Sequence, residues 1–322
     1  MLRPLYPNIR PYDQQTIEIG EHHIYVEQSG NRRGTPVIYL HGGPGGGSSE
    51  DHRRYFDPQK YRIIIFDQRG CGRSKPHASI RNNTTWDLIT DMEEIRQMLG
   101  IKQWLIAGGS WGTTLAMAYG IKHAQHVLGF ILRGIFLGTP AEVRWLYAHQ
   151  GAAAIFPDYY QDFLVPLRPH IQQEPVKAYQ QILNSDNELA KFQAAKAWSL
   201  WEQRISTLEA NHSTIETPEQ IHSAVAMATI ENHYFVNHCF FEADYLLNHI
   251  DTISHIPAII IHGRYDMVCQ LQRAYELKQR WQNATLNVIP LAGHSGFEPG
   301  IINAFCQASD KMAAFLEEQS NS

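Results

Sequence analysis

Cysteine is scarce in this chain. Its 322 residues include four cysteines, which lie far apart and form no C-x-x-C pair: Cys71, Cys239, Cys269 and Cys306. Disulfide frameworks and structural zinc sites both need cysteines at recurring short spacings. The sequence therefore predicts reduced thiols in a cytoplasmic protein and argues against a disulfide or zinc framework.

Long apolar runs and excess positive charge are also missing. No uninterrupted apolar segment approaches the length of a membrane span, and Pro4 and Pro7 interrupt the N-terminus before the apolar region of a secretory signal can form. Lysine and arginine total 27 against 32 aspartate and glutamate, a net charge of −5 with no basic block. These features predict neither nucleic acid nor a membrane as partner and favour a small-molecule or peptide substrate.

Metal and phosphate motifs are absent as well. The chain contains no His-Glu-x-x-His, and neither His22-His23 nor His233 with His238 has the helical spacing of zinc ligands. The glycine-rich stretch at residues 42–47 is not followed by Gly-Lys-Ser/Thr, so it does not match a phosphate-binding loop. We therefore expect no bound metal.

The chain does contain an alternation of apolar strands and amphipathic helices. Strand patterns occur at residues 36–40, 61–66, 104–107, 127–132, 256–261 and 285–290, and several are the continuous apolar runs typical of buried parallel strands. Residues 15–29 alternate like an antiparallel edge hairpin, and residues 85–99 have helical spacing. The pattern predicts an α/β fold with a mostly parallel sheet.

The alternation stops between residues 136 and 248. This segment shows only helical patterns rich in Trp, Tyr, Phe, Gln and Ala, and strand patterns resume at residue 256. A chain of 322 residues is long enough for one large domain that carries an insertion. We therefore expect residues 1–135 and 249–322 to form the core, and residues 136–248 to form an all-helical cap.

A serine between two glycines lies at the junction of a strand and a helix. The pattern Gly108-x-Ser110-x-Gly112 follows the apolar run at 104–107 and precedes an alanine-rich helical segment. In such a sharp turn the serine backbone is strained, and side chains at the flanking positions would collide with the neighbouring strand or helix. The pattern predicts a nucleophilic hydroxyl on Ser110 at a helix N-terminus, where developing negative charge is favoured.

The partners of a serine nucleophile come later in the chain. In this architecture the acid precedes the histidine, and each follows a strand. Asp266 lies in the turn after the strand at 256–261, and His294 lies in the turn after the strand at 285–290. Because all three residues follow predicted strands in the required order, we expect Ser110, His294 and Asp266 to form a catalytic triad.

The glycine-rich loop after the strand at 36–40 is a candidate oxyanion hole. Without side chains to shield them, its backbone N–H groups can bind a negatively charged oxygen. The first N–H after a serine nucleophile commonly completes such a site. We therefore expect the oxyanion donors to be Trp111 and either Gly42 or Gly43.

Five short segments carry a combined resemblance that is much more specific than any one of them. They are HGGPG at 41–45, DQRGCGRS at 67–74, GGSWG at 108–112, GRYD at 263–266 and GH at 293–294. Together they resemble the proline iminopeptidase family of the α/β-hydrolase fold. The resemblance implies a prolyl aminopeptidase, which removes an N-terminal proline from small peptides and uses neither a metal nor an organic cofactor.

The resemblance also implies where substrate is selected. Family enzymes bind the charged N-terminal amine through glutamates of the cap, and Glu202 and Glu231 occupy the matching positions. Phe136 and Phe235 match the aromatic wall of the family's proline pocket, with Tyr147 as a further candidate. A carboxylate drawn towards a core needs a cationic partner, which a substrate ammonium can supply. The alternatives are a solvated helix face for Glu202 and ordinary core packing for the aromatic residues.

Two other functions stay open at this point. An esterase or amidase of the same fold would keep the triad but would not depend on Glu202 and Glu231. A catalytically silent α/β-hydrolase would act as a binding protein, although the complete set of Ser110, Asp266 and His294 speaks against it. Substrate preference and labelling of the serine separate these alternatives.

Overall fold

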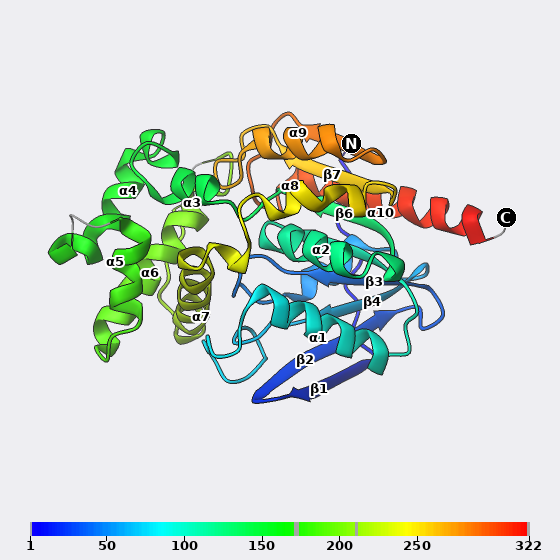
Figure 1. Cartoon of the computed structure of the whole chain (residues 1–322), viewed down its shortest axis with the longest axis horizontal. Coiled ribbons are helices and arrows are strands. Elements are labelled where there is room, and N and C mark those ends of the chain that lie inside the picture. The colour runs from blue at the N-terminus through cyan, green and yellow to red at the C-terminus, as the bar shows by residue number, and fades with distance from the viewer. Residues whose placement is uncertain (1, 171–173, 210–211, 321–322) are drawn as a thin grey trace.

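A twisted sheet of eight strands forms the centre of the computed structural model, which describes residues 2–170, 174–209 and 212–320 (Figure 1). The strand order is β1-β2-β4-β3-β5-β6-β7-β8. β1 pairs antiparallel with β2, and β2 with β4, whereas all later neighbours are parallel, as predicted. The strands are β1 Asp13–Ile19, β2 His22–Gly30, β3 Thr35–Leu40, β4 Tyr61–Phe66, β5 Trp104–Gly109, β6 Val127–Arg133, β7 Ala258–Gly263 and β8 Ala284–Ile289.

Helices cover both faces of this sheet, which explains the continuous apolar runs. Side chains alternate between the faces, so Ile64 packs in one hydrophobic cluster while Ile63 and Ile65 pack in the other. Residues of α1 (Thr85–Met98), α2 (Trp111–Lys122) and α9 (Leu271–Arg280) belong to the first cluster. The second cluster lies under the 3₁₀ helix η1 (Glu50–Tyr55) and α10 (Pro299–Ser320).

Helical elements follow β6 and continue until β7 begins. In Figure 1, α3 to α7 gather at one end of the molecule, whereas α8 lies against α2 beside the sheet. The domain limits at 135/136 and 248/249 stay a prediction. The helices are α3 Pro140–Tyr147, α4 Pro157–Leu164, α5 Pro175–Leu183, α6 Glu188–Ile205, α7 Pro218–Val236 and α8 Tyr245–His249, with 3₁₀ turns at Ala152–Ala154, Val165–His170, His238–Phe240 and Ile250–Thr252.

Local sequence signals start several of these helices. Proline occupies the first turn of α3, α4, α5 and α7, where its missing N–H has no intrahelical partner to lose. Three helices begin with a capping box, in which a threonine and the residue three positions later satisfy each other's backbone N–H groups. These pairs are Thr84 with Asp87, Thr139 with Glu142, and Thr217 with Gln220.

Helix α7 packs directly against the glycine-rich loop that follows β3. A Cβ atom added to Gly45 would lie 3.0 Å from the Ala226 carbonyl oxygen and 3.0 Å from Ile230 Cβ, and the residue has a φ of +96°. Only glycine allows both this backbone conformation and this approach. The contact therefore joins the inserted helices to the carboxyl edge of the sheet.

The structure also bears on two features of composition. All four cysteines are buried and free. Within the described parts of the chain, no helix combines the length and the apolar character needed to cross a bilayer.

His52 is a half-buried histidine that the fold keeps neutral. Its ring stacks on Tyr39 with 4.5 Å between centroids, and its Nδ1 accepts a hydrogen bond from the Ser49 N–H at 3.0 Å. Burial lowers the pKa of His52 to about 3, and the neighbouring His41 and Arg133 act in the same direction. At pH values between the ordinary histidine pKa of about 6.5 and this lowered pKa, His52 binds a proton in the unfolded chain but not in the folded chain.

We expect the free energy of unfolding to fall as the pH drops below about 6.5, because protons then favour the unfolded chain. His52→Phe keeps a ring stacked on Tyr39 but cannot titrate, so its stability should decline less with pH. Urea unfolding at about pH 7 and about pH 4.5 measures this difference. His255→Phe, at an exposed histidine, serves as the matched control and should decline as the unmodified protein does. Equal declines in the His52 variant and the unmodified protein would contradict the expectation.

Candidate active site

Ser110 occupies the strained turn that the sequence predicts. It follows β5 directly and precedes α2, with φ 56° and ψ −126°, a region that side-chain-bearing residues seldom adopt. A Cβ atom on Gly112 would lie 2.1 Å from the Leu40 carbonyl oxygen, and one on Gly108 would lie 2.9 Å from the Gly112 carbonyl oxygen. The two glycines let the chain turn sharply from β5 into α2 and let the start of α2 lie close to β3. Ser110 stands at the N-terminus of that helix.

Asp266 and His294 lie together, each in the turn after its strand. His294 Nδ1 lies 2.8 Å from Asp266 Oδ2, while the second carboxylate oxygen accepts the N–H groups of Val268 at 3.0 Å and Cys269 at 2.7 Å. Burial by itself raises the pKa of Asp266, but the charge and hydrogen bond of His294 outweigh it, so the net pKa is lowered. The carboxylate therefore stays ionised and orients the imidazole.

Ser110 approaches this pair through the end of β6. Its N–H donates to the Arg133 carbonyl at 2.9 Å, and a Cβ atom on the next residue, Gly134, would lie 3.1 Å from His294 Cε1. The ring nitrogens of His294 lie near Asp266 and Arg133, and among the described residues no hydrogen bond joins them to the Ser110 hydroxyl.

Sequence reasoning missed two residues beside the His–Asp pair. Arg133 Nη1 donates to the His294 carbonyl at 2.9 Å and lies 3.4 Å from its Nε2. His262 is fully buried, 3.5 Å from Asp266 Oδ2, and its Nε2 lies 2.9 Å from the Cys269 carbonyl. Burial lowers the pKa of His262, which favours the neutral ring. His262 directly precedes the GRYD motif and Arg133 directly follows the strand pattern at 127–132, but only tertiary contacts show what they hold.

The predicted oxyanion loop lies against the serine turn. A Cβ atom on Gly42 would be 3.3 Å from Ser110 Cβ, and the Gly42 carbonyl accepts the Gly46 N–H at 3.2 Å. Gly43 has a φ of +112°. The loop therefore turns back on itself and presents backbone next to the Ser110 hydroxyl.

Gln68 connects the two halves of the candidate oxyanion hole. Its amide nitrogen donates to the His41 carbonyl at 3.0 Å, and its amide oxygen accepts the Trp111 indole N–H at 2.9 Å. The Gln68 backbone N–H donates to His41 Nε2 at 3.0 Å, and burial lowers the pKa of His41, which favours the neutral acceptor form. Gln68 lies in the quoted DQRG motif, but its sequence position does not reveal that it bridges these two loops.

Glu202 and Glu231 form a buried acidic pair between α6 and α7. They are 8% and 2% exposed, so Glu202 does not lie on a solvated face. The Tyr147 hydroxyl donates to Glu202, and Trp198 Nε1 donates to Glu231 at 2.6 Å. Burial raises the pKa of Glu202 and raises that of Glu231 well above the ordinary value, with the Glu202 charge adding to the latter shift. The donors that contact the pair directly are neutral.

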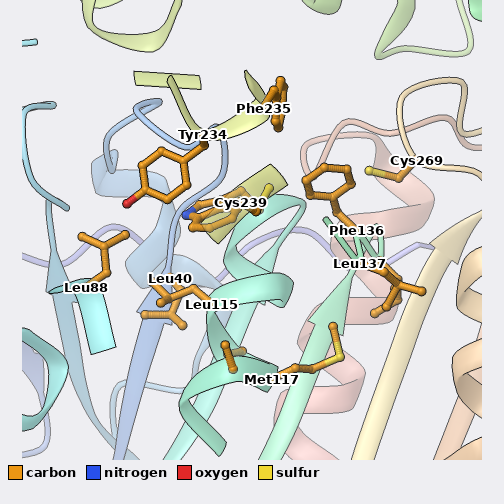
Figure 2. Packing of buried hydrophobic residues seen from close by; sticks show 14 of the residues in the cluster. Leu40, Leu88, Leu115, Met117, Phe136, Leu137, Tyr234, Phe235, Cys239 and Cys269 are labelled. Atoms are coloured by element: carbon orange, nitrogen blue, oxygen red, sulfur yellow. The ribbon is translucent and has the colours of Figure 1, made fainter. Parts of the chain in front are cut away.

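Aromatic residues border this acidic pair. The Phe136 and Phe235 rings meet edge to face with 5.7 Å between centroids, and Tyr147 lies 5.8 Å from Phe235 and stacks on Trp198 at 4.3 Å. Figure 2 shows Phe235 from α7 near Phe136, which lies three residues after the end of β6. The three aromatic residues proposed for a proline pocket are therefore one contiguous cluster next to the carboxylates.

The arrangement supplies the parts of an acyl-transfer site: a serine at a helix N-terminus, a His–Asp pair, and a backbone loop free of side chains. Among the described residues, no three histidine, cysteine, aspartate or glutamate side chains are grouped so as to hold a metal ion.

The fold and this site define a hydrolase of the α/β-hydrolase class. A sequence profile for the alpha/beta hydrolase fold matches residues 35–300. The crystal structure of proline iminopeptidase from Mycobacterium smegmatis has a TM-score of 0.61 at 16% identity and covers 94% of this chain and 100% of that one. The proline iminopeptidase-related protein of Thermus thermophilus has a TM-score of 0.62 at 22% identity, covering 95% and 98%. At these identities the likeness shows the fold alone.

Curated relatives give the particular family. Proline iminopeptidase of Xylella fastidiosa (strain Temecula1) is 47% identical over 311 residues, which cover 96% of this chain and 99% of the relative. Proline iminopeptidase of Arabidopsis thaliana is 45% identical over 318 residues, covering 98% and 83%. The chain belongs to the proline iminopeptidase family and is a peptidase.

Proposed function

We propose that this protein is a serine aminopeptidase that releases N-terminal proline from small peptides. The observation that carries the proposal is the buried acidic pair, Glu202 and Glu231, whose direct contacts are neutral. Buried carboxylates are costly without a cationic partner. The ammonium group of an N-terminal proline supplies that charge and two N–H donors, and its ring fits against the adjoining aromatic cluster.

The first half of the proposed reaction forms a prolyl ester. Ser110 Oγ attacks the proline carbonyl carbon while its proton passes to His294 Nε2, and Asp266 stabilises the resulting imidazolium through Nδ1–H. The carbonyl oxygen becomes negatively charged and accepts hydrogen bonds from the Trp111 N–H and an N–H of Gly42 or Gly43. The 2.8 Å contact between His294 and Asp266 supports these roles.

The second half releases proline. His294 gives its proton to the departing nitrogen as the C–N bond breaks, and the shortened peptide leaves. A water molecule then attacks the prolyl ester, passes a proton to His294, and frees proline as the Ser110 oxygen regains its proton. In both halves of the proposed reaction, His294 accepts the proton and then donates it.

Two further assignments belong to this proposal. Residues 136–248 act as the cap that closes over the site, which the position of the acidic pair on α6 and α7 supports. The protein acts in the cytoplasm, which the four free cysteines support.

Three chromogenic substrates test the proposal: prolyl anilide, N-acetylprolyl anilide and a simple aryl ester. We expect kcat/KM for the N-blocked anilide to be lower than for prolyl anilide by about 100-fold or more, because acetylation removes the ammonium that the acidic pair binds. Equal values for the blocked and free anilides would overturn the aminopeptidase assignment and favour an esterase or amidase.

A further inference from the structure

Arg133 is a partly buried cation without a carboxylate partner. It is the last residue of β6, and no aspartate or glutamate in the described parts of the chain pairs with it, since Asp266 contacts His294 instead. The buried Arg69, by contrast, pairs with Asp91 at 2.6 Å. A guanidinium that is shielded from water is stabilised by an anion. Arg133 therefore has the charge to bind an anionic ligand.

The contacts of Arg133 leave donors available for such a ligand. Its Nη1 donates to the neutral His294 carbonyl at 2.9 Å. Burial raises the pKa of the neighbouring Tyr39, although the Arg133 charge opposes this shift, so the phenol stays neutral and does not supply the anion. A guanidinium carries five N–H donors, which is more than these contacts use. It can hold a carboxylate through two parallel hydrogen bonds.

The guanidinium lies beside the serine turn because position 109 is glycine. A Cβ atom on Gly109 would lie 2.1 Å from Arg133 Nη2, so a side chain there would displace the guanidinium. Gly109 directly precedes Ser110. Arg133 Nη1 also lies 3.4 Å from His294 Nε2. The cation is therefore next to both the turn that carries the nucleophile and the ring nitrogen that transfers protons in the proposed reaction.

The proton transfer determines where the departing residue begins. His294 Nε2 must come within about 3 Å of the departing nitrogen. In a dipeptide, the carboxylate carbon lies roughly 2.5 Å from that nitrogen, which brings the carboxylate within reach of a cation beside Nε2. We propose that Arg133 binds the α-carboxylate of the residue that follows proline and thereby favours dipeptides over longer peptides, which present a neutral carbonyl at this place. This inference rests on the proposed function.

Two substrates that differ only in that carboxylate test the site: Pro-Gly and Pro-Gly-NH2. Both contain the same scissile bond, but the amide replaces the anion with a neutral group. We expect kcat/KM of the unmodified protein to be higher for Pro-Gly by about tenfold or more, chiefly through a lower KM, because hydrogen bonds between charged groups are the stronger ones. An equal or higher value for the amide would overturn the proposed site before any variant is made.

Variants of Arg133 then show whether this residue causes the preference. Arg133→Gln removes the charge but keeps an N–H donor for the His294 carbonyl, and it should lower the ratio of kcat/KM for Pro-Gly to that for Pro-Gly-NH2 by about tenfold. Arg133→Lys keeps the charge without the planar fork and should give an intermediate ratio. Arg81→Gln removes a charge from an exposed arginine and is the matched control, which should leave the ratio unchanged.

The ratio separates binding of the carboxylate from a purely structural role. If Arg133 only holds the His294 loop in place, Arg133→Gln lowers kcat/KM for both substrates by the same factor, and the proposed site is wrong. If the unmodified protein releases no proline from either substrate, the proposed function fails, and this inference fails with it. Release from both substrates at a ratio that does not depend on Arg133 overturns the carboxylate site alone.

Discussion

Replacing Ser110 with alanine should lower kcat for proline release by about 10⁴- to 10⁶-fold, because no other group in the described parts of the chain is placed to form the prolyl ester. The substitution removes one hydroxyl from a turn whose conformation depends on its glycine neighbours, so the fold should persist. Initial rates with prolyl anilide and far-ultraviolet circular dichroism measure the two expectations. Activity near that of the unmodified protein would show that the nucleophile is another residue.

A labelling experiment sharpens this prediction. A fluorophosphonate should modify the unmodified protein once, at Ser110, and should not modify the alanine variant. Ser254→Ala, which removes a hydroxyl far along the chain before β7, is the matched control and should keep both activity and labelling. Failure of the unmodified protein to react would instead favour a silent α/β-hydrolase that only binds its ligands.

Replacing Glu231 with glutamine should lower kcat/KM for prolyl anilide by about 10²- to 10³-fold, because it removes one charge from the buried pair that, under the proposed function, binds the substrate ammonium. Glutamine keeps an acceptor for the Trp198 N–H, so the packing between α6 and α7 should persist. An aryl ester without an amine should lose little activity. An equal loss on the ester would show that Glu231 has a structural role instead.

The pH dependence of kcat/KM distinguishes the contribution of Glu202 and Glu231 from that of His294. Burial raises the pKa of both Glu202 and Glu231, so their protonated forms persist to higher pH than in an exposed glutamate. As the pH falls through these raised values, the pair loses negative charge, and kcat/KM for prolyl anilide should fall with it. The ester profile should lack this fall, and Glu231→Gln should flatten it. Glu216→Gln, at an exposed glutamate before α7, is the control that should change neither profile.

The sheet and the serine turn were predictable because their causes are local. The runs at 61–66 and 104–107 are apolar because both faces of the sheet are covered, and this shows in a few consecutive letters. Position 112 must be glycine because a side chain there would collide with the Leu40 carbonyl. This local requirement is visible in the sequence as the Gly-x-Ser-x-Gly spacing. The chain order of Asp266 and His294 then follows from the order of the strands.

The contacts that hold the site together were not predictable in this way. Contacts with site residues between 4 and 161 positions away involve Gln68, Arg133 and His262. No common periodicity or spacing in the sequence predicts these contacts. The pairing of Glu202 with Glu231 depends on how α6 crosses α7, and the sequence pointed to it only through a family resemblance.

The packing of Gly45 against α7 has a mechanical consequence. The helix that carries Glu231 contacts the loop that we propose supplies the oxyanion donors. Under the proposed function, a shift of this helix would displace both the group that binds the substrate's terminus and the loop that stabilises charge during bond breaking. Changes along the contact surface of α7 should therefore alter turnover together with affinity. Under the proposed function, α7 would therefore couple recognition of the substrate's amino terminus to stabilisation of the negative charge that develops during the reaction.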